Sequence, residues 1–269
     1  MPELPEVETT RRGIAPHLVG RVCSGARVRQ PMLRWPVPEL DGVLAGSTLE
    51  AVERRAKYLL LRFGHGTLIV HLGMSGSLRV LPAATAPRTH DHVDLLFDST
   101  CLRLHDPRRF GAVLWTQDDP MTHPLLRQLG PEPLSDAFDG AHLQRAAKGR
   151  RSAIKNLLMD GHVVVGVGNI YATEALFRAG IHPGRASGRV ARARLDRLAD
   201  EVKTVLTYAI GRGGTTLRDF LNESGEPGYF AQELLVYGRA GQACRHCGSL
   251  IRTRRIGQRA SAYCPHCQR

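Results

Sequence analysis

The stretch TLEAVERRAKYLLLRFGHGTLIVHLGMSGSLRVL, residues 48–81, decides the fold of the first half of the chain. Short runs rich in Leu, Val, Ile and Phe alternate with Gly, Ser and charged residues every few positions. This spacing is typical of short strands joined by tight turns in an all-β sandwich or barrel. We therefore predict strands over residues 21–28, 48–55, 58–63, 67–72, 77–81, 92–97, 101–104 and 111–116.

Helical spacing appears on both sides of these strands. Upstream, Val7, Ile14 and Leu18 repeat on one face and Gly20 follows them, which predicts a helix over residues 5–18. Downstream, the segment LGPEPLS at residues 129–135 is rich in Pro and Gly and marks a domain boundary. Beyond it we predict helices over residues 141–148, 152–159, 169–179 and 191–212. The chain is thus predicted to be an α+β multidomain protein.

Two CxxC motifs near the end of the chain, Cys244–Cys247 and Cys264–Cys267, enclose sixteen residues. This spacing lies within the range of four-cysteine zinc sites, whereas redox CxxC motifs usually occur singly and near a βαβ pattern. Because about thirty residues cannot bury a sufficient core, one structural zinc ion should supply much of the folding free energy. We predict Cys244, Cys247, Cys264 and Cys267 as ligands, His246 and His266 as exposed spacers, and strands over residues 250–255 and 260–264.

The charge of the chain favours a polyanionic partner. Lys and Arg number 37 against 25 Asp and Glu, a net charge of +12. Residues 239–269 hold seven arginines and no acidic residue, so more than half of the surplus is concentrated in the cysteine module. Such clustering is typical of nucleic-acid binding. No apolar run is long enough to span a membrane and the N-terminus lacks a secretory signal, so we expect a cytoplasmic protein.

The first residues offer a nucleophile. Once Met1 is removed, Pro2 has a secondary amine that can attack an aldehyde-like carbon and form an iminium. Its usual pKa of about 7.7–8.0 leaves a neutral fraction near pH 7. Glu3 and Glu6 are expected to share a helical face beside this amine and to handle protons. The alternative is ordinary, because acidic residues in a first helical turn also complement the helix dipole.

Several long motifs together resemble one family. They are PELPEVETTRRG at residues 2–13, RRAKYLLL at 54–61, HLGMSGSLR at 71–79, DPRRFG at 106–111 and VGVGNIYATEALF at 165–177. In this order and spacing, and with the cysteine module at the end, they resemble the formamidopyrimidine-DNA glycosylase (Fpg) family. The start PELPE and the segment GGTTL…GYF resemble the branch acting on oxidised purines rather than the endonuclease VIII branch.

The resemblance implies a fold and a set of catalytic residues. It implies an N-terminal helix with a β-sandwich over residues 1–131, a helix–two-turn–helix (H2TH) domain with a lesion-recognition loop over 132–236, and a zinc finger over 237–269. Pro2 would be the nucleophile, Glu3 the acid that helps to open the deoxyribose, and Glu6 a supporting carboxylate. Lys57 would contact phosphate at the lesion and assist strand cleavage, as would Arg259 at the tip of the zinc hairpin.

The resemblance also implies DNA contacts. Met74, Arg108 and Phe110 would fill the space that an extruded nucleotide vacates, while Arg109 is either structural or a phosphate contact. The segment 215–230 would close over the extruded base, and Tyr237 would line the sugar or base. Asn169 has its own rationale, because it follows a Gly-Val-Gly turn at the start of a helix, where amide groups face anions. The phosphate contacts implied are His71, His90, Arg150, Asn169 and Arg259.

The function implied is that of a bifunctional enzyme of base excision repair. It would be a DNA-formamidopyrimidine glycosylase, an N-glycosyl hydrolase that releases 8-oxoguanine and formamidopyrimidines, and a lyase that nicks abasic sites by β,δ-elimination. The partner would be duplex DNA with oxidised bases or abasic sites, and we expect a monomer associated with the nucleoid. Two alternatives stay open: a zinc-ribbon DNA binder without activity, and an enzyme that acts mainly on oxidised pyrimidines.

Overall fold

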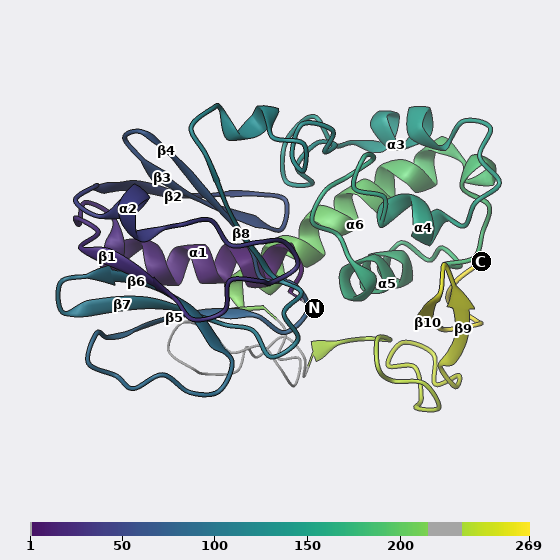
Figure 1. Cartoon of the computed structure of the whole chain (residues 1–269). Coiled ribbons are helices and arrows are strands. Elements are labelled where there is room, and N and C mark those ends of the chain that lie inside the picture. Colours follow the sequence, from purple (N-terminus) through teal and green to yellow (C-terminus); the bar gives the residue numbers. More distant parts are fainter. Residues whose placement is uncertain (1, 215–232) are drawn as a thin grey trace. The chain divides into compact units, whose positions relative to one another are not determined.

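The computed structural model describes residues 2–214 and 233–269. By its internal contacts the chain divides into two units, whose described residues are 2–127 with 212–214, and 128–211 with 233–269 (Figure 1). The predicted loop at residues 215–230 lies outside the described residues. The predicted domain boundaries after residues 131 and 236 stay predictions.

The first unit contains a β-sandwich, as predicted. One antiparallel sheet has the order β1-β6-β7-β5 and the other the order β2-β3-β4-β8 (Figure 1). Apolar side chains of both sheets, among them Leu61, Leu78, Leu95 and Leu104, pack in a common core between them. The strands are β1 (Gly25–Val28), β2 (Leu49–Arg55), β3 (Tyr58–Phe63), β4 (Gly66–His71), β5 (Ser77–Pro82), β6 (Asp91–Phe97), β7 (Thr100–His105) and β8 (Ala112–Thr116).

Helix α1 (Leu4–Leu18) adds its apolar face to this core. Val7, Ile14 and Leu18 are fully buried in it, which confirms the predicted periodicity. Glu8 fastens the helix to β2, because one of its carboxylate oxygens lies 3.2 Å from Arg54 Nε. Burial alone would raise the pKa of Glu8, but hydrogen bonds from Arg11 and Arg12 and the charge of Arg54 lower it to about 2. The start of the chain is therefore held rigidly on the sandwich.

The predicted strand over residues 21–28 is wrong in its first half. Gly20 and Cys23 donate backbone hydrogen bonds to Leu49 and Ser47, beside β2, and Ser24 then donates to Leu96 of β6. The chain therefore crosses from one sheet to the other, and only β1 joins a ladder with β6. The short helix α2 (Asp41–Leu44) was not predicted, because four residues show no period.

The second unit is helical, as predicted. It contains α3 (Gly140–Ala147), α4 (Ile154–Leu158), α5 (Asn169–Arg178) and α6 (Arg192–Gly211), each within two residues of its predicted bounds. Leu195, Leu198, Val202, Val205 and Ala209 of α6 are buried on one face, against α3 and α5. Short 3-10 turns occur at Pro120–Thr122 in the first unit and at Ser187–Arg189 in the second.

A two-stranded hairpin, β9 (Arg252–Ile256) and β10 (Arg259–Tyr263), completes this unit. Both strands are displaced by one or two residues from their predicted bounds, because Ile256 pairs with Arg259 and leaves only Gly257 and Gln258 in the turn. Ile251, Ala262 and Cys264 pack on Phe177 of α5.

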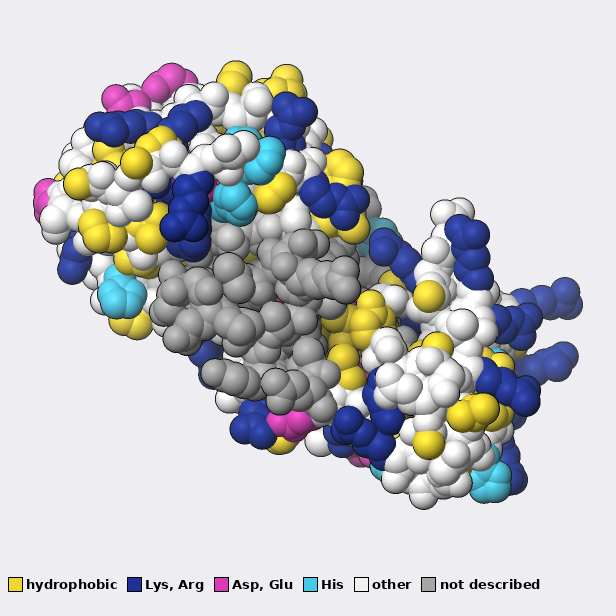
Figure 2. All heavy atoms as spheres, turned by 90° about the horizontal axis from the view of Figure 1, so that it is seen from below, with side chains coloured by type: hydrophobic (Ala, Val, Ile, Leu, Met, Phe, Trp, Pro, Cys, Tyr) yellow, Lys and Arg dark blue, Asp and Glu magenta, His cyan; other side chains and the backbone are white. Residues whose placement is uncertain are grey.

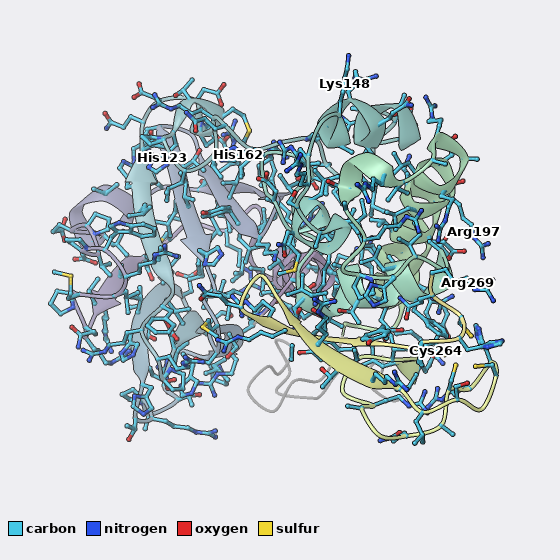
Figure 3. All side chains as sticks on the ribbon, turned by 90° about the vertical axis from the view of Figure 1, so that its right-hand side faces the viewer. His123, Lys148, His162, Arg197, Cys264 and Arg269 are labelled. Carbon is cyan, nitrogen blue, oxygen red and sulfur yellow. The ribbon has the colours of Figure 1, made fainter. Side chains whose placement is uncertain are left out.

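Lys148 points outward at the end of the second unit away from Cys264 (Figure 3). No helix among the described residues has the length and apolar character needed to cross a bilayer.

Candidate active site and nucleic-acid interface

The start of α1 brings together Pro2, Glu3 and Glu6, all of which are buried. Glu3 is the residue that caps the helix, and its backbone N–H donates to Glu6 Oε2 at 2.7 Å. The expectation that both glutamates share a helical face is therefore wrong in detail, since Glu3 precedes the helix. Their closeness is nevertheless real, and it results from capping geometry. Buried carboxylates at the start of the chain form a site suited to proton transfer.

Gly214, just beyond the end of α6, lies against the Glu6 side chain of this buried group. A Cβ added to Gly214 would stand 2.9 Å from Glu6 Oε1, whereas one added to Gly213 would meet nothing within 4 Å. Both glycines have positive φ, +81° and +74°. The backbone at Gly214 therefore limits where the Glu6 carboxylate can lie, a contact that the sequence did not indicate.

Lys57 occupies the turn between β2 and β3 and is half-buried. The preceding residue, Ala56, has a φ of 55°, and its carbonyl accepts a hydrogen bond from Arg54 Nη1 at 2.9 Å. Because Arg54 also binds Glu8, one arginine connects helix α1 with the turn that carries Lys57.

His71, at the end of β4, lies beside this turn. Its ring centroid is 4.8 Å from that of Tyr58, the next residue after Lys57. Burial, together with the charges of Lys57 and Arg34, lowers the pKa of His71 to about 4. The Gly73 N–H donates to His71 Nδ1 at 3.0 Å, so the neutral ring has its proton on Nε2. His71 is therefore a hydrogen-bond donor at neutral pH.

The three predicted wedge residues lie on two turns of the first unit. Met74 is in the turn between β4 and β5 and is half-buried. Arg108 and Phe110 are exposed in the turn before β8, with the Arg108 guanidinium 4.9 Å from the centroid of the Phe110 ring. Arg109 between them has a φ of 54°. Phe110 is 44% exposed, so its ring is accessible to a partner.

Asp106, which sequence reasoning missed, joins these two turns. It is fully buried, and its two carboxylate oxygens accept hydrogen bonds from the Ser75 hydroxyl at 3.3 Å and the Gly111 N–H at 2.7 Å. Ser75 follows Met74 and Gly111 follows Phe110. The sequence signal for Asp106 is its place at the start of the motif DPRRFG. Only Arg and Phe residues of that motif were predicted to belong to the site.

In the second unit a buried lysine connects the start of α5 with the hairpin. Lys155 Nζ donates to Asn169 Oδ1 at 2.5 Å and to Ser261 Oγ at 2.6 Å. Asn169 Nδ2 also donates to the Ala260 carbonyl at 3.3 Å, next to Arg259. The structure thus brings the predicted residues Asn169 and Arg259 into one network. Lys155, its centre, was not predicted.

Tyr237 is held by a second residue that was not predicted, Glu174 of α5. The buried Glu174 carboxylate accepts backbone hydrogen bonds from Leu235, Val236 and Tyr237 at 2.8–2.9 Å. Three N–H groups on one carboxylate fix the segment that leads into the cysteine module.

Two further predicted residues, Arg150 and His90, are exposed. Arg150 is exposed and lies 3.4 Å from Asp160, and no described contact joins it to Asn169 or Arg259. His90 is exposed with a φ of 73°, and its carbonyl accepts the Asp106 N–H. Its ring centroid is 6.1 Å from those of His92 and His105.

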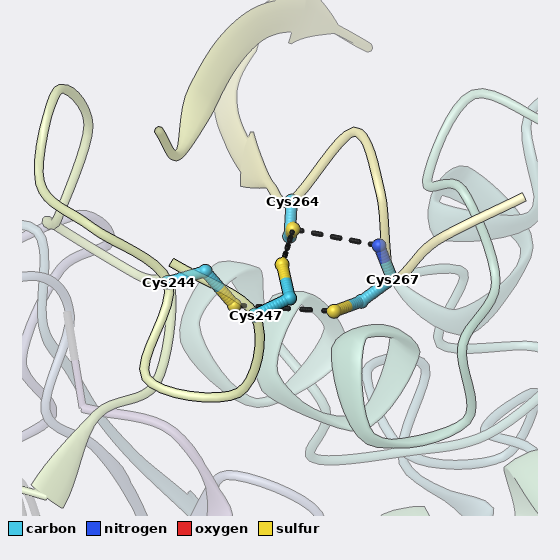
Figure 4. A group of neighbouring side chains, drawn as sticks. All are labelled: Cys244, Cys247, Cys264 and Cys267. Atoms are coloured by element: carbon cyan, nitrogen blue, oxygen red, sulfur yellow. Dashed lines mark hydrogen bonds between the residues drawn. The ribbon is translucent and has the colours of Figure 1, made fainter. Parts of the chain in front are cut away.

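The four predicted cysteines form one cluster (Figure 4). Their Sγ atoms all lie within 4.8 Å of one another, with Cys247 and Cys264 at 3.4 Å and Cys244 and Cys267 at 4.0 Å. Tetrahedral zinc with bonds of about 2.3 Å separates its sulfur ligands by about 3.8 Å, so the cluster fits Zn²⁺. His246 and His266 are exposed and outside the cluster, as predicted, and Cys23 and Cys101 are buried elsewhere. Because all four cysteines gather at one possible metal position, zinc binding explains both CxxC motifs and a redox dithiol does not.

Around this cluster the surface is basic. Lys and Arg side chains gather at the end of the second unit that bears the hairpin (Figure 2, right). The exposed arginines there are Arg245, Arg252, Arg254, Arg255, Arg259 and Arg269. A rigid metal-bound hairpin with this charge is suited to contact phosphates.

The β-sandwich with its buried N-terminal site, the helical unit and the four-cysteine finger define a class of protein: a zinc-finger DNA glycosylase. Sequence models agree, matching the formamidopyrimidine-DNA glycosylase N-terminal domain at residues 1–113, the H2TH domain of these enzymes at 129–221, and the zinc finger found in Fpg and IleRS at 241–269. A formamidopyrimidine-DNA glycosylase of Methylococcus capsulatus is 62% identical over 271 aligned positions, which cover 100% of both chains. The chain belongs to the formamidopyrimidine-DNA glycosylase family.

Solved structures agree in fold. The MutM (Fpg) protein of Thermus thermophilus superposes with a TM-score of 0.90 at 37% identity, covering 99% of this chain and 98% of that one. Lactococcus lactis Fpg superposes with a TM-score of 0.92 at 32% identity over 100% of both chains. That protein was solved with DNA containing N7-benzyl-Fapy-dG and with DNA containing an oxidised pyrimidine.

Proposed function

We propose that this protein is a bifunctional DNA glycosylase and abasic-site lyase that releases 8-oxoguanine and formamidopyrimidines from duplex DNA. The observation that carries the proposal is the buried group of Pro2, Glu3 and Glu6 at the start of a chain that is similar over its whole length to enzymes of this name. A buried amine and carboxylate are the groups that base release and strand cleavage by one nucleophile require.

The first step uses Pro2. Its neutral amine, freed by removal of Met1, attacks C1′ of an extruded nucleotide. The bond from C1′ to the base breaks with both electrons on the base, which takes up the proton that the amine loses. Glu3 gives a proton to the sugar ring oxygen, so that the ring opens and an iminium forms between Pro2 and C1′. Glu6, which accepts the Glu3 N–H, keeps the acid in place.

The later steps cut the strand. The iminium acidifies the C2′ proton, whose loss expels the 3′ phosphate, and a second elimination expels the 5′ phosphate. Lys57 and Arg259 are proposed to assist these departures by stabilising phosphate charge. Zinc keeps the hairpin folded so that Arg259 is presented at its turn.

Extrusion of the nucleotide costs a few kcal/mol of stacking, which other groups must replace. We assign this role to Met74, Arg108 and Phe110. Support comes from the Asp106 carboxylate, which fastens both turns that carry them. Phe110 would stack, and Arg108 would donate to the unpaired base.

The remaining contacts hold the backbone and the base. His71, His90, Arg150, Asn169 and Arg259 are proposed to bind phosphates, and Tyr237 to line the sugar or base. The segment 215–230, proposed to cover the extruded base, is outside the described residues. Association of a monomer with the nucleoid in the cytoplasm is proposed from the net charge of +12.

Borohydride trapping tests the nucleophile. The protein is incubated with an 8-oxoguanine duplex and borohydride, and its intact mass is measured to verify removal of Met1. A covalent protein–DNA adduct is expected, and a Pro2→Gly protein should lose most of both trapping and nicking. Normal activity of that variant, or nicking by protein that still keeps Met1, would overturn the assignment.

The same assay separates the alternatives. A zinc-ribbon binder without activity would shift the duplex in a gel and leave it uncut. The L. lactis complex with an oxidised pyrimidine keeps open a preference for that lesion. This preference is measured by letting an 8-oxoguanine duplex and an oxidised-pyrimidine duplex compete in one reaction. We expect the oxidised purine to be consumed first.

A further inference from the structure

Arg34 lies in a loop that the sequence motifs do not include. Leu33 and Val37 anchor this loop in the sandwich core, while Arg34 itself is exposed. Its guanidinium carbon is 4.6 Å from the centroid of the Trp35 ring. A flat cation on an indole face loses less freedom when it binds, because the ring already restricts its orientation.

The backbone of Arg34 joins this loop to the site. Its N–H donates to the Gly111 carbonyl at 3.1 Å, directly after Phe110. Gly111 in turn packs on β4, since a Cβ added to it would stand 2.9 Å from the His71 carbonyl oxygen. Arg34 is therefore fastened beside the end of β4, where His71 lies.

The charge of the Arg34 side chain affects the pKa values of His71 and Tyr58. Its charge, like that of Lys57, lowers the pKa of His71, and it opposes the rise in the pKa of Tyr58 that burial causes. No carboxylate forms an ion pair with Arg34 among residues 2–214 and 233–269. Arg34 and the turn that carries Lys57 thus flank the end of β4 where His71 lies, and positive charge there favours a bound anion.

We propose that Arg34, supported by Trp35, is a further phosphate-binding residue of the DNA interface, beside Lys57 and His71. The proposal rests on the function proposed above, since it takes the anion to be a phosphodiester of the lesion strand. The guanidinium would donate two parallel hydrogen bonds to the phosphate oxygens, while His71 donates from Nε2.

The test is the salt dependence of binding to a duplex containing a tetrahydrofuran abasic analogue, which cannot be processed. For Arg34→Gln we expect affinity to fall several-fold, and the slope of log K against log salt to decrease by about 0.9, the value for one phosphate contact. Arg34→Lys keeps the charge and should restore the slope. Arg21→Gln is the matched control, because Arg21 is exposed beyond the other end of the 15-residue helix α1.

Each outcome has one meaning. If Arg34→Gln binds with the affinity and slope of Arg21→Gln, Arg34 does not contact phosphate and the inference is wrong. If Arg34→Gln and Arg34→Lys lose affinity equally but keep the wild-type slope, the loop is structural and the inference is also wrong. If the wild-type protein fails to bind the duplex and to form a borohydride adduct with an 8-oxoguanine duplex, the proposed function fails instead.

Discussion

His71 shows how a single residue acquires its role from its surroundings. An unperturbed histidine has a pKa near 6.5. In its neutral form either ring nitrogen can carry the proton and donate, while the other accepts. Here burial and two neighbouring cations keep the ring neutral, and the Gly73 N–H occupies Nδ1. Only Nε2–H remains to donate, which suits a phosphate oxygen at any pH at which DNA repair proceeds.

A pH prediction follows from this residue. Because the folded pKa is about 4 and the unfolded value 6.5, the native protein binds fewer protons than the unfolded chain between these values. The free energy of unfolding contributed by His71 is therefore fully present above pH 6.5 and lost as the pH falls towards 4. His71→Gln should flatten the pH dependence of urea unfolding in this range.

NMR titration of the His71 ring gives the direct measurement. A midpoint near pH 4 is expected, and Arg34→Gln should raise it because one cation is removed. His17→Gln, which replaces an exposed histidine of α1, serves as the control and should leave the midpoint unchanged. A midpoint near 6.5 in the wild-type protein would contradict the neutral donor.

At the scale of elements, strained turns coincide with the proposed site. Five non-glycine residues have positive φ among the described residues: Ala56, His90, Asp98, Arg109 and Gln258. All except Asp98 are a proposed site residue or directly adjoin one. Such conformations cost of order 1 kcal/mol and persist where the surroundings enforce them. The sequence does not reveal them, since none of these residues is a glycine, although His and Asp adopt the conformation more often than Ala, Arg or Gln.

The two glycines after α6 offer a matched pair for a test. Both have left-handed backbone, so alanine costs about 1 kcal/mol of strain at either position. Only Gly214→Ala should also push the Glu6 carboxylate away and weaken its bond to the Glu3 N–H. We expect the rate of borohydride trapping to fall at least tenfold for Gly214→Ala and little for Gly213→Ala, with both variants folded at the assay temperature. Equal trapping by the two variants would show that Gly214 does not position Glu6.

The elements that could be predicted are those with a period of their own. The strands β2 to β8 and the helices α1 and α3 to α6 alternate or repeat within one segment. The first half of the predicted strand 21–28 failed because its partners belong to two different sheets. In the site, motifs indicated which side chains would act, but not the buried groups that hold them. Asp106, Lys155 and Glu174 each bind partners from distant segments, which no local pattern shows.

At the scale of the whole molecule, the positive charge available to DNA is expected to depend on the bound metal. Seven of the arginines behind the net charge of +12 are in residues 239–269. This segment has a small apolar core, and the cysteine cluster holds its two ends together. Zinc binding is worth about 10–16 kcal/mol in small fingers, far more than such a core can supply. We therefore expect the arginines to be ordered only while the metal is bound.

Removal of zinc should thus weaken DNA binding without unfolding the β-sandwich, whose core contains none of the four cysteines. We expect Cys247→Ser, which changes an exposed ligand, to lose the one zinc ion and lower the salt slope of duplex binding by about 0.9 for each phosphate that the hairpin no longer binds. Cys101→Ser, in the sandwich, should keep zinc and the wild-type slope. Metal content by mass spectrometry, binding titrations and thermal unfolding make the comparison. A metal-free protein with an unchanged slope would contradict this dependence, because the slope counts the phosphates that the protein neutralises and none would then have been lost with the zinc.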